Sequence, residues 1–126
     1  MESQSFSIRK RIKSFSYAFC GLKTALQEEH NARIHLVAAV LALGCAAFFE
    51  LNSYEWIAVV FAIGFVFSME LLNSAIENMA DFVSPQRHDT IRKIKDLSAA
   101  AVLISALAAL VVGLIVFLPK VCKLVC

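Results

Sequence analysis

Long apolar runs alternate with short polar connections along the chain. The apolar runs cover residues 34–49, 56–69 and 99–118. The last run contains no charged residue, and as a helix it is long enough to cross roughly 30 Å of hydrocarbon. The pattern therefore predicts three membrane-spanning helices, over about residues 30–50, 55–81 and 92–118.

The segment before the first apolar run has a different pattern, because its apolar residues recur at steps of four and three. This spacing puts them on one face of a helix: Ile8, Ile12, Phe15, Phe19, Leu22 and Leu26. Basic residues lie beside this stripe, namely Arg9, Lys10, Arg11, Lys13 and Lys23. We therefore expect an amphipathic helix over about residues 6–28 that lies on an anionic membrane surface. An ordinary surface helix packed on the rest of the protein is the alternative, and the two are compatible.

Composition agrees with a membrane protein and excludes several other classes. The 126 residues are 60% hydrophobic with a mean hydropathy of +0.72, which is more apolar than an ordinary soluble domain. The four glycines are scattered and form neither a Walker loop nor a dinucleotide-binding turn, and the four cysteines lack zinc-type spacing. No removable signal peptide is recognised, so we expect the chain to be retained whole. The sequence predicts one all-α domain, residues 1–126, with no nucleic-acid partner.

A stripe of polar groups follows the second apolar run, with no Gly or Pro between them to end the helix. At 100° per residue, Glu70, Asn73, Glu77 and Asp81 fall on one helical face. Such groups are costly in hydrocarbon, so they should face protein, water or a cation rather than lipid. We interpret this stripe as the candidate functional site.

Residues outside the second span also bear on this stripe. Glu29 lies just before the first span, at the depth expected for the stripe. Lys95 and Asp96 lie where the third span begins, and their helical spacing allows both to point towards the stripe. Pro119 is expected to end the third span.

The distribution of basic residues predicts the orientation of the chain. Of the twelve Lys and Arg residues, six precede the first span, four lie between the second and third spans, and two lie in the tail. The positive-inside rule makes the side with more basic residues cytoplasmic. We therefore expect the N-terminus and the polar stripe on the cytoplasmic side, where nucleotide and magnesium are available.

Carboxylates, an amide and a lysine at a membrane surface suit phosphoryl transfer. Mg²⁺ takes oxygen ligands, usually one or two carboxylates plus substrate phosphates. Transfer also needs positive charge near the moving group and a base for the attacking hydroxyl. Glu29 and Glu77 could hold the metal, Lys95 could neutralise phosphate, and Glu70 could be the base.

Three other interpretations remain open from the residues alone. Internal pairing that joins the helices at their polar end explains the same groups, and spacing alone favours it. An ion or proton relay would spread carboxylates across the membrane depth, whereas the first and third spans carry none in their middles. A noncatalytic membrane scaffold would make the polar stripe incidental.

A resemblance to a known family bears on this choice. The prokaryotic diacylglycerol kinase family of small integral membrane lipid kinases has a signature similar to Glu70-Leu71-Leu72-Asn73-Ser74-Ala75-Ile76-Glu77, followed by Asp81, His88, Lys95-Asp96 and residues 99–103. The similarity extends from about Arg9 to Pro119. It implies a homotrimer of three-span subunits in the bacterial inner membrane, each with a surface helix, and active sites shared between subunits. It also implies ATP as phosphoryl donor, Mg²⁺ as cofactor and a membrane lipid alcohol as acceptor.

The resemblance assigns roles to single residues. Glu70 matches the general base, and Glu29 and Glu77 match the magnesium-binding glutamates. The nucleotide-side matches are Lys10, Tyr17, Asn73, His88, Lys95 and Asp96. The matches on the lipid-substrate side are Glu70, His35, Trp56 and Ala99.

The lipid acceptor differs between two branches of this family, one for diacylglycerol and one for undecaprenol. Residues 31–35, 53–56 and 117–119 look more like the undecaprenol branch. Residue 35 is His, whereas the resemblance to the diacylglycerol branch would give Glu at this position. Residue 99 is Ala, whereas the same branch would give Ser. We predict phosphorylation of undecaprenol to undecaprenyl phosphate, with conversion of diacylglycerol to phosphatidic acid as the alternative.

Overall fold

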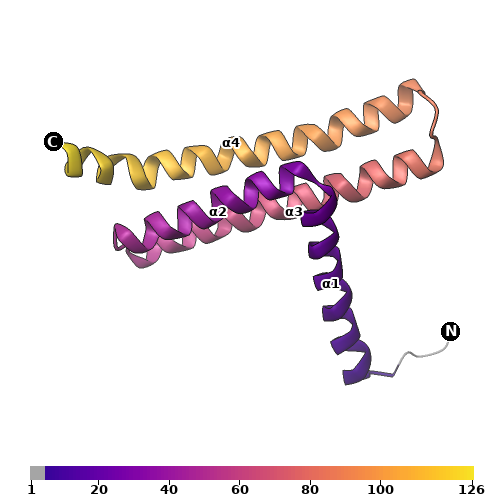
Figure 1. Ribbon diagram of the computed structural model, residues 1–126, viewed down its shortest axis with the longest axis horizontal. Helices are drawn as coiled ribbons and strands as arrows, with labels where there is room; N and C mark the ends of the chain where they lie inside the picture. The colour runs from indigo at the N-terminus through magenta and orange to yellow at the C-terminus, as the bar shows by residue number, and fades with distance from the viewer. Residues whose placement is uncertain (1–4) are drawn as a thin grey trace.

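The computed structural model describes residues 5–126, and four helices account for most of them. They are α1 (Ile8–Glu28), α2 (His30–Phe48), α3 (Ser53–Val83) and α4 (Asp89–Val125). Helices α2, α3 and α4 run along a common axis, whereas α1 leaves this bundle at a steep angle (Figure 1). The described part of the chain contains no strand. The prediction of an all-α fold is confirmed, and α2, α3 and α4 are each long and apolar enough to cross a membrane.

The unequal lengths of the helices divide the bundle into two parts. Helix α2 has 19 residues and is therefore about 28 Å long, which matches the hydrocarbon thickness of a bilayer. Helices α3 and α4 have 31 and 37 residues. Both continue past the start of α2 towards their mutual connection (Figure 1). We call this continuation, residues 71–83 of α3 and 89–97 of α4, the polar extension.

Small buried residues spaced seven apart hold the bundle together. They are Ala32, Ala39 and Ala46 on α2, Val59 and Val66 on α3, and Ser98 and Ser105 on α4. A seven-residue period keeps one face of a helix against its neighbour along its whole length. Small residues let helix backbones approach closely in lipid, where hydrophobic burial does not drive association. Most of the larger apolar side chains face outward instead.

Helix α2 ends in a Schellman hydrogen-bond pattern. The N–H of Leu51 donates to the carbonyl of Ala46 at 3.2 Å, and the N–H of Glu50 donates to the carbonyl of Ala47 at 3.3 Å. Glu50 has a φ of 51°, in the left-handed region that glycine usually occupies at this position. Leu51 is buried in an apolar cluster that also contains Ala46, Val59 and Val116. We call these four residues the closing cluster, because they fill the bundle at this turn.

The same end of the bundle is also joined by polar contacts. Asn52 Oδ1 accepts a hydrogen bond from the N–H of Glu55 at 2.9 Å, and Glu55 Oε1 accepts one from the N–H of Asn52 at 3.1 Å. This capping box fixes the start of α3. Glu55 Oε2 also lies 3.2 Å from Lys120 Nζ, so α4 is paired with α3 here.

The prediction that Pro119 ends the third span is wrong. Helix α4 includes Pro119 and continues to Val125. Proline removes one backbone donor and crowds the preceding turn. This cost falls near the end of α4, and the next residue, Lys120, pairs with Glu55. Helix α4 also begins earlier than the predicted residue 92, because His88 Nδ1 accepts a hydrogen bond from the N–H of Thr90 at 3.1 Å and caps the helix.

Candidate active site

The candidate site lies where α2 begins and α1 leaves the bundle. Glu29 is the only residue between the two helices, and its backbone is extended, with φ −105° and ψ 114°. The Arg33 side chain donates from Nε to the carbonyl of Leu26 at 2.7 Å and from Nη2 to the carbonyl of Gln27. These are carbonyls that the last turn of α1 leaves without helical partners. Arg33 therefore holds the junction together with Glu29 at its centre.

Glu70 is the buried carboxylate of this junction. It is 2% exposed, and its Oε2 has no hydrogen-bond partner within residues 5–126. His35 Nε2 lies 3.7 Å from Oε2, which is beyond hydrogen-bond distance. A buried acceptor without a partner is costly, and ionisable groups at membrane depth usually serve a function. Oε2 of Glu70 is therefore a buried acceptor without a hydrogen-bond partner, with His35 within ion-pair distance.

The two other predicted glutamates are neighbours of Glu70. Glu29 and Glu77 are both half-buried. Their carboxylate oxygens are the hard ligands that Mg²⁺ takes. In the part of the chain that the structure describes, no three His, Cys, Asp or Glu side chains form a ready-made metal site. Two carboxylates suffice when nucleotide phosphates supply further ligands. The magnesium site therefore stays a prediction, for which Glu29 and Glu77 supply suitable oxygen ligands.

Two side-chain contacts join α3 to α4 in the polar extension and at its border with the rest of the bundle. Lys95 Nζ lies 2.5 Å from Asp81 Oδ1, near the connection of the two helices. Nearer to the membrane part, Ser98 Oγ donates a hydrogen bond to Asn73 Oδ1 at 2.7 Å. Lys95 and Asn73, which were both predicted on the nucleotide side, thus lie along the contact between α3 and α4. We call this contact the seam.

An apolar groove of about 470 Å³ runs along the bundle from this site. Residues of α2, α3 and α4 line it, with His35 near one end and Phe117 near the other. Several lining residues are small, among them Ala39, Ala109 and Gly113. The groove is therefore suited to a hydrocarbon chain whose polar end lies near Glu70.

Comparison with known proteins identifies the family. Residues 16–117 match the model of a family described as prokaryotic diacylglycerol kinase. The chain belongs to the prokaryotic diacylglycerol kinase family. The match includes α2, α3 and most of α1 and α4. The prediction of an enzyme that is a lipid kinase is confirmed at this level, and a kinase uses ATP as its phosphoryl donor.

Individual relatives of this kinase family carry two different names. Undecaprenol kinase of Bacillus subtilis is 36% identical over 113 residues, which cover 90% of this chain and 92% of the relative. Diacylglycerol kinase of Synechocystis sp. is 34% identical over 114 residues, which cover 90% of this chain and 65% of the relative. Diacylglycerol kinase of Escherichia coli K12 is 29% identical over 111 residues, which cover 88% of this chain and 91% of the relative.

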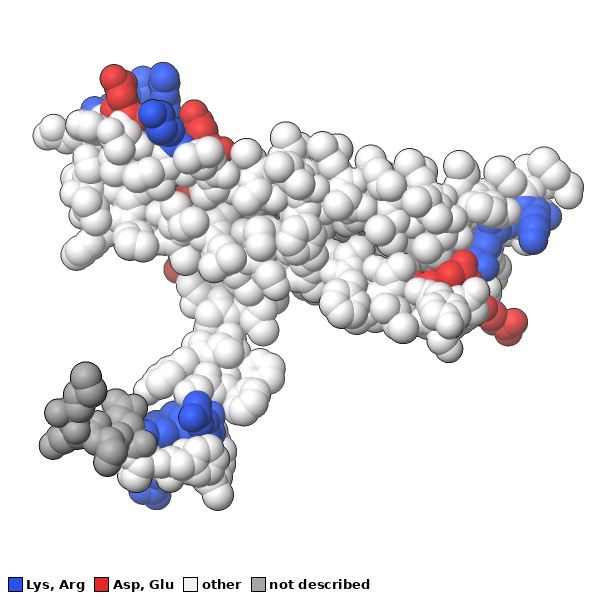
Figure 2. Space-filling view, turned by 180° about the vertical axis from the view of Figure 1, so that it is seen from behind, with Lys and Arg blue, Asp and Glu red and all other residues white. Residues whose placement is uncertain are grey.

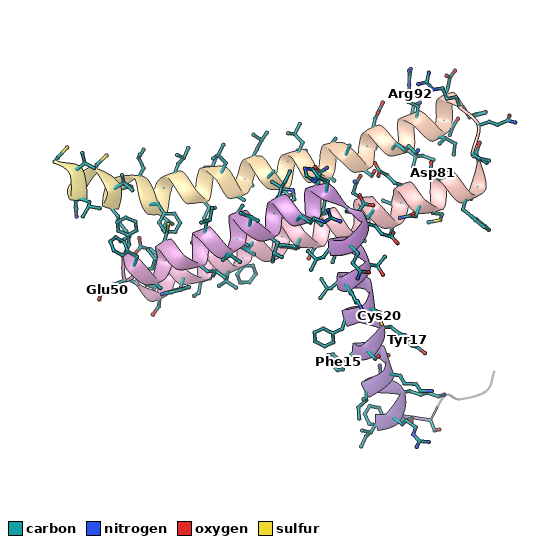
Figure 3. The ribbon with its side chains drawn as sticks, viewed as in Figure 1. Phe15, Tyr17, Cys20, Glu50, Asp81 and Arg92 are labelled. Carbon is teal, nitrogen blue, oxygen red and sulfur yellow. The ribbon has the colours of Figure 1, made fainter. Side chains whose placement is uncertain are left out.

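The residues of α1 that resemble nucleotide-side positions of the kinase family do not reach the junction. Lys10 and Tyr17 are exposed on α1. Phe15 and Tyr17 point to opposite sides of this helix, and Tyr17 points to the side on which Asp81 and Arg92 lie (Figure 3). Figure 2 shows basic side chains gathered on the free end of α1 and near the connection of α3 to α4.

Four other predicted residues also lie away from Glu70. Asp96 is exposed on another face of α4, in a depression that Asp89, Arg92, Lys93 and Leu97 also line, although the sequence predicted that it could face the stripe. His88 caps α4 at the connection, and Ala99 is exposed. Trp56 packs against the closing cluster, about 21 Å along α3 from Glu70.

Two buried serines belong to the site but were not predicted as functional. Ser74 lies one turn after Glu70, is 8% exposed, and its Oγ has no hydrogen-bond partner in the described chain. Ser98 binds Asn73 across the seam. The available signal was the seven-residue spacing of Ser98 and Ser105, which matches that of the small residues on the other helices.

Proposed function

We propose that this lipid kinase transfers the γ-phosphoryl group of ATP to the hydroxyl of undecaprenol at the cytoplasmic surface of the bacterial inner membrane. The observation that carries the proposal is the buried Oε2 of Glu70, which has no hydrogen-bond partner among the described residues and lies where α2 begins. The oxygen lies near the polar end of an apolar groove. Diacylglycerol is the alternative acceptor for the same chemistry.

On the acceptor side, the apolar groove receives part of the hydrocarbon chain and the lipid hydroxyl meets Glu70. Oε2 of Glu70 takes the hydroxyl proton as the lipid oxygen forms a bond to the γ-phosphorus. The bond between the γ-phosphorus and the oxygen that links it to the β-phosphate breaks, and ADP leaves with that oxygen. The burial of Glu70 keeps water from competing with the lipid alcohol.

On the donor side, the polar extension supplies donors and positive charge to the phosphates. The amide of Asn73 donates to phosphate oxygens, and Lys95 neutralises the moving phosphoryl group, leaving its contact with Asp81. Glu29 and Glu77 would hold Mg²⁺, which when bound neutralises phosphate charge and orients the nucleotide.

The remaining nucleotide-side residues are supplied by a second subunit in this proposal. Lys10 and Tyr17 are exposed on α1, and Asp96 is exposed on the outer face of α4. A homotrimer with sites shared between neighbouring subunits would bring such residues to the junction of another copy. The outward-facing apolar side chains of α2, α3 and α4 leave ample surface for that contact.

Two residues and one relative support undecaprenol over diacylglycerol. His35 lies beside Glu70, and the resemblance to the diacylglycerol branch would give Glu instead of His at position 35. Residue 99 is Ala, whereas that branch would give Ser. The relative named undecaprenol kinase is 36% identical, against 34% and 29% for the diacylglycerol kinases of Synechocystis sp. and Escherichia coli K12. The concentration of Lys and Arg on α1 and near the α3–α4 connection supports a cytoplasmic site.

The test is transfer of labelled γ-phosphate from Mg-ATP by the purified protein in detergent, with undecaprenol and diacylglycerol offered in parallel. We expect labelled undecaprenyl phosphate, and Glu70→Gln should lower the rate by about 100-fold or more because it removes the base. Its thermal unfolding midpoint should stay near that of the wild type. Glu55→Gln, at the other end of the bundle, is the matched control and should keep its activity.

Two outcomes would change the proposal. Faster labelling of diacylglycerol would replace the acceptor while leaving the mechanism in place. Labelling by Glu70→Gln at the wild-type rate would remove Glu70 from the reaction. If the wild type labels neither lipid, the scaffold or relay interpretation takes the place of the kinase mechanism.

A further inference from the structure

We propose that Ser98 is a positioning residue for phosphoryl transfer and acts through the side-chain amide of Asn73. The inference rests on the proposed function, because it concerns how Asn73 meets the phosphates. Ser98 is 7% exposed, and its Oγ donates to Asn73 Oδ1 at 2.7 Å across the contact between α3 and α4. It is therefore a buried hydroxyl bonded directly to a side chain of the site.

In this hydrogen bond Ser98 takes the oxygen of Asn73 and leaves the NH₂ group of the amide for a ligand. A primary amide carries an acceptor oxygen at one position and an NH₂ group with two donors at the other. Because Ser98 occupies the oxygen, the NH₂ group remains for the ligand. Phosphate oxygens require donors, whereas the opposite orientation would offer an oxygen ligand suited to Mg²⁺. While Ser98 donates to the oxygen, Asn73 has the orientation that suits phosphate.

The same hydroxyl is also tied to the backbone of its own helix. Ser98 Oγ lies 3.0 Å from the carbonyl of Lys95, one turn earlier on α4, and the two acceptors share one hydroxyl proton. Lys95 is the residue proposed to neutralise the moving phosphoryl group. The hydroxyl therefore connects the amide on α3 to the turn of α4 that carries this lysine, and it fixes the position of the two groups relative to each other.

Ser105 provides a matched comparison within the same helix. It lies seven residues after Ser98, is fully buried, and donates from Oγ to the carbonyl of Val102 at 2.7 Å. Within residues 5–126, the side-chain hydrogen bond of Ser105 has both its donor and its acceptor on α4. Both serines fill the seam between α3 and α4, but only Ser98 reaches a site residue. Any purely structural cost of losing a seam hydroxyl should appear equally in Ser105→Ala.

The experiment compares the kinetics of Ser98→Ala, Ser98→Thr and Ser105→Ala with labelled ATP and the lipid that the wild type prefers. We expect Ser98→Ala to lower kcat by about 3- to 10-fold, the factor expected for loss of one neutral hydrogen bond that acts in the transition state. The KM for lipid should not change, because Ser98 lies on the nucleotide side. Ser98→Thr keeps the hydroxyl and should restore most of kcat, and Ser105→Ala should match the wild type.

Variants of Asn73 test whether Ser98 acts through the amide. Asn73→Asp keeps an oxygen for Ser98 but removes the NH₂ group, so it should lose as much activity as Asn73→Ala. Adding Ser98→Ala to Asn73→Ala should cause no further loss of kcat, because the amide through which Ser98 acts is already absent. Wild-type activity in Asn73→Asp, or an undiminished effect of Ser98→Ala in the double variant, would overturn the proposal.

The two levels of the proposal fail in different ways. If the wild type labels a lipid while Ser98→Ala behaves like Ser105→Ala, the positioning role of Ser98 is wrong and the kinase mechanism stands. If the wild type labels neither lipid, the proposed function is wrong and the role of Ser98 falls with it.

Discussion

The two ends of the α3–α4 pair are built in opposite ways. At the end beside the α2–α3 turn, Asn52 and Glu55 cap each other, Glu55 pairs with Lys120, and the closing cluster fills the space between the helices. At the other end, Glu70 Oε2 and Ser74 Oγ are buried without hydrogen-bond partners among the described residues. One end satisfies its polar groups internally, and the other keeps some of them unsatisfied.

The difference separates residues that stabilise the fold from residues proposed to meet a ligand. Unsatisfied buried polar groups lower stability, so a fold tolerates them where a ligand or reaction uses them. The closing cluster and its caps offset this cost at a distance from the site. Substitutions at the two ends should therefore affect different observables: phosphoryl transfer at the Glu70 end and the free energy of unfolding at the other.

The largest expected effect is on magnesium dependence, at the Glu70 end. Glu77→Gln should lower phosphoryl transfer by about 100-fold at low magnesium and raise the magnesium concentration for half-maximal rate by at least about 10-fold, since it removes a proposed ligand. A magnesium titration of the initial rate measures both. Glu55→Gln should leave the titration unchanged, and an unaltered curve for Glu77→Gln would remove that residue from the metal site.

A substitution in the closing cluster should have the converse effect. Leu51 is 7% exposed, so Leu51→Ala should lower the free energy of unfolding by about 2 kcal/mol or more by leaving a cavity. Activity per folded molecule should not change. Denaturant titration in mixed micelles measures the free energy of unfolding, and the labelled-phosphate assay measures the activity. Leu107, which is 52% exposed on α4, is the control, because Leu107→Ala leaves no cavity within the subunit. Equal destabilisation by both variants would contradict the comparison.

The smallest expected effect is a gain of stability at the same turn. Glu50 has a φ of 51°, which costs a residue with a side chain about 1 kcal/mol relative to glycine. Glu50→Gly should therefore raise the free energy of unfolding by about 1 kcal/mol. Glu50→Ala keeps the strained conformation and should show no such gain. If the two variants prove equally stable, the backbone conformation is not what limits this turn.

The helices could be predicted from the sequence because each apolar run, and the stripe of α1 with its steps of four and three, depends only on residues within that helix. It misjudged Pro119, because the continuation of α4 involves a contact between Lys120 and Glu55, which are distant in the sequence. The left-handed conformation of Glu50 also had no local signal, since the sequence offers Glu where glycine is usual.

The candidate site was predictable in part for the same reason. Glu70, Asn73 and Glu77 share one face of one helix, so periodicity alone groups them. The bond of Ser98 to Asn73 depends on the register between α3 and α4, which no single helix specifies. The outward position of Asp96 likewise depends on which face of α4 packs against α3. Glu29 was predicted near the stripe from the length that a helix needs to span a bilayer, and its depth in the membrane stays a prediction.

The single extended residue between α1 and α2 has a mechanical consequence. Helix α1 has 21 residues and forms an arm of about 31 Å, and Glu29 is its pivot. The apolar side chains of this arm are exposed, so in the proposed enzyme the arm rests on the lipid headgroups. Arg33 clamps the last carbonyls of the arm to the first turn of α2 and limits its swing. In the proposed enzyme, the position of the arm on the bilayer surface would therefore act on Glu29, a proposed magnesium ligand.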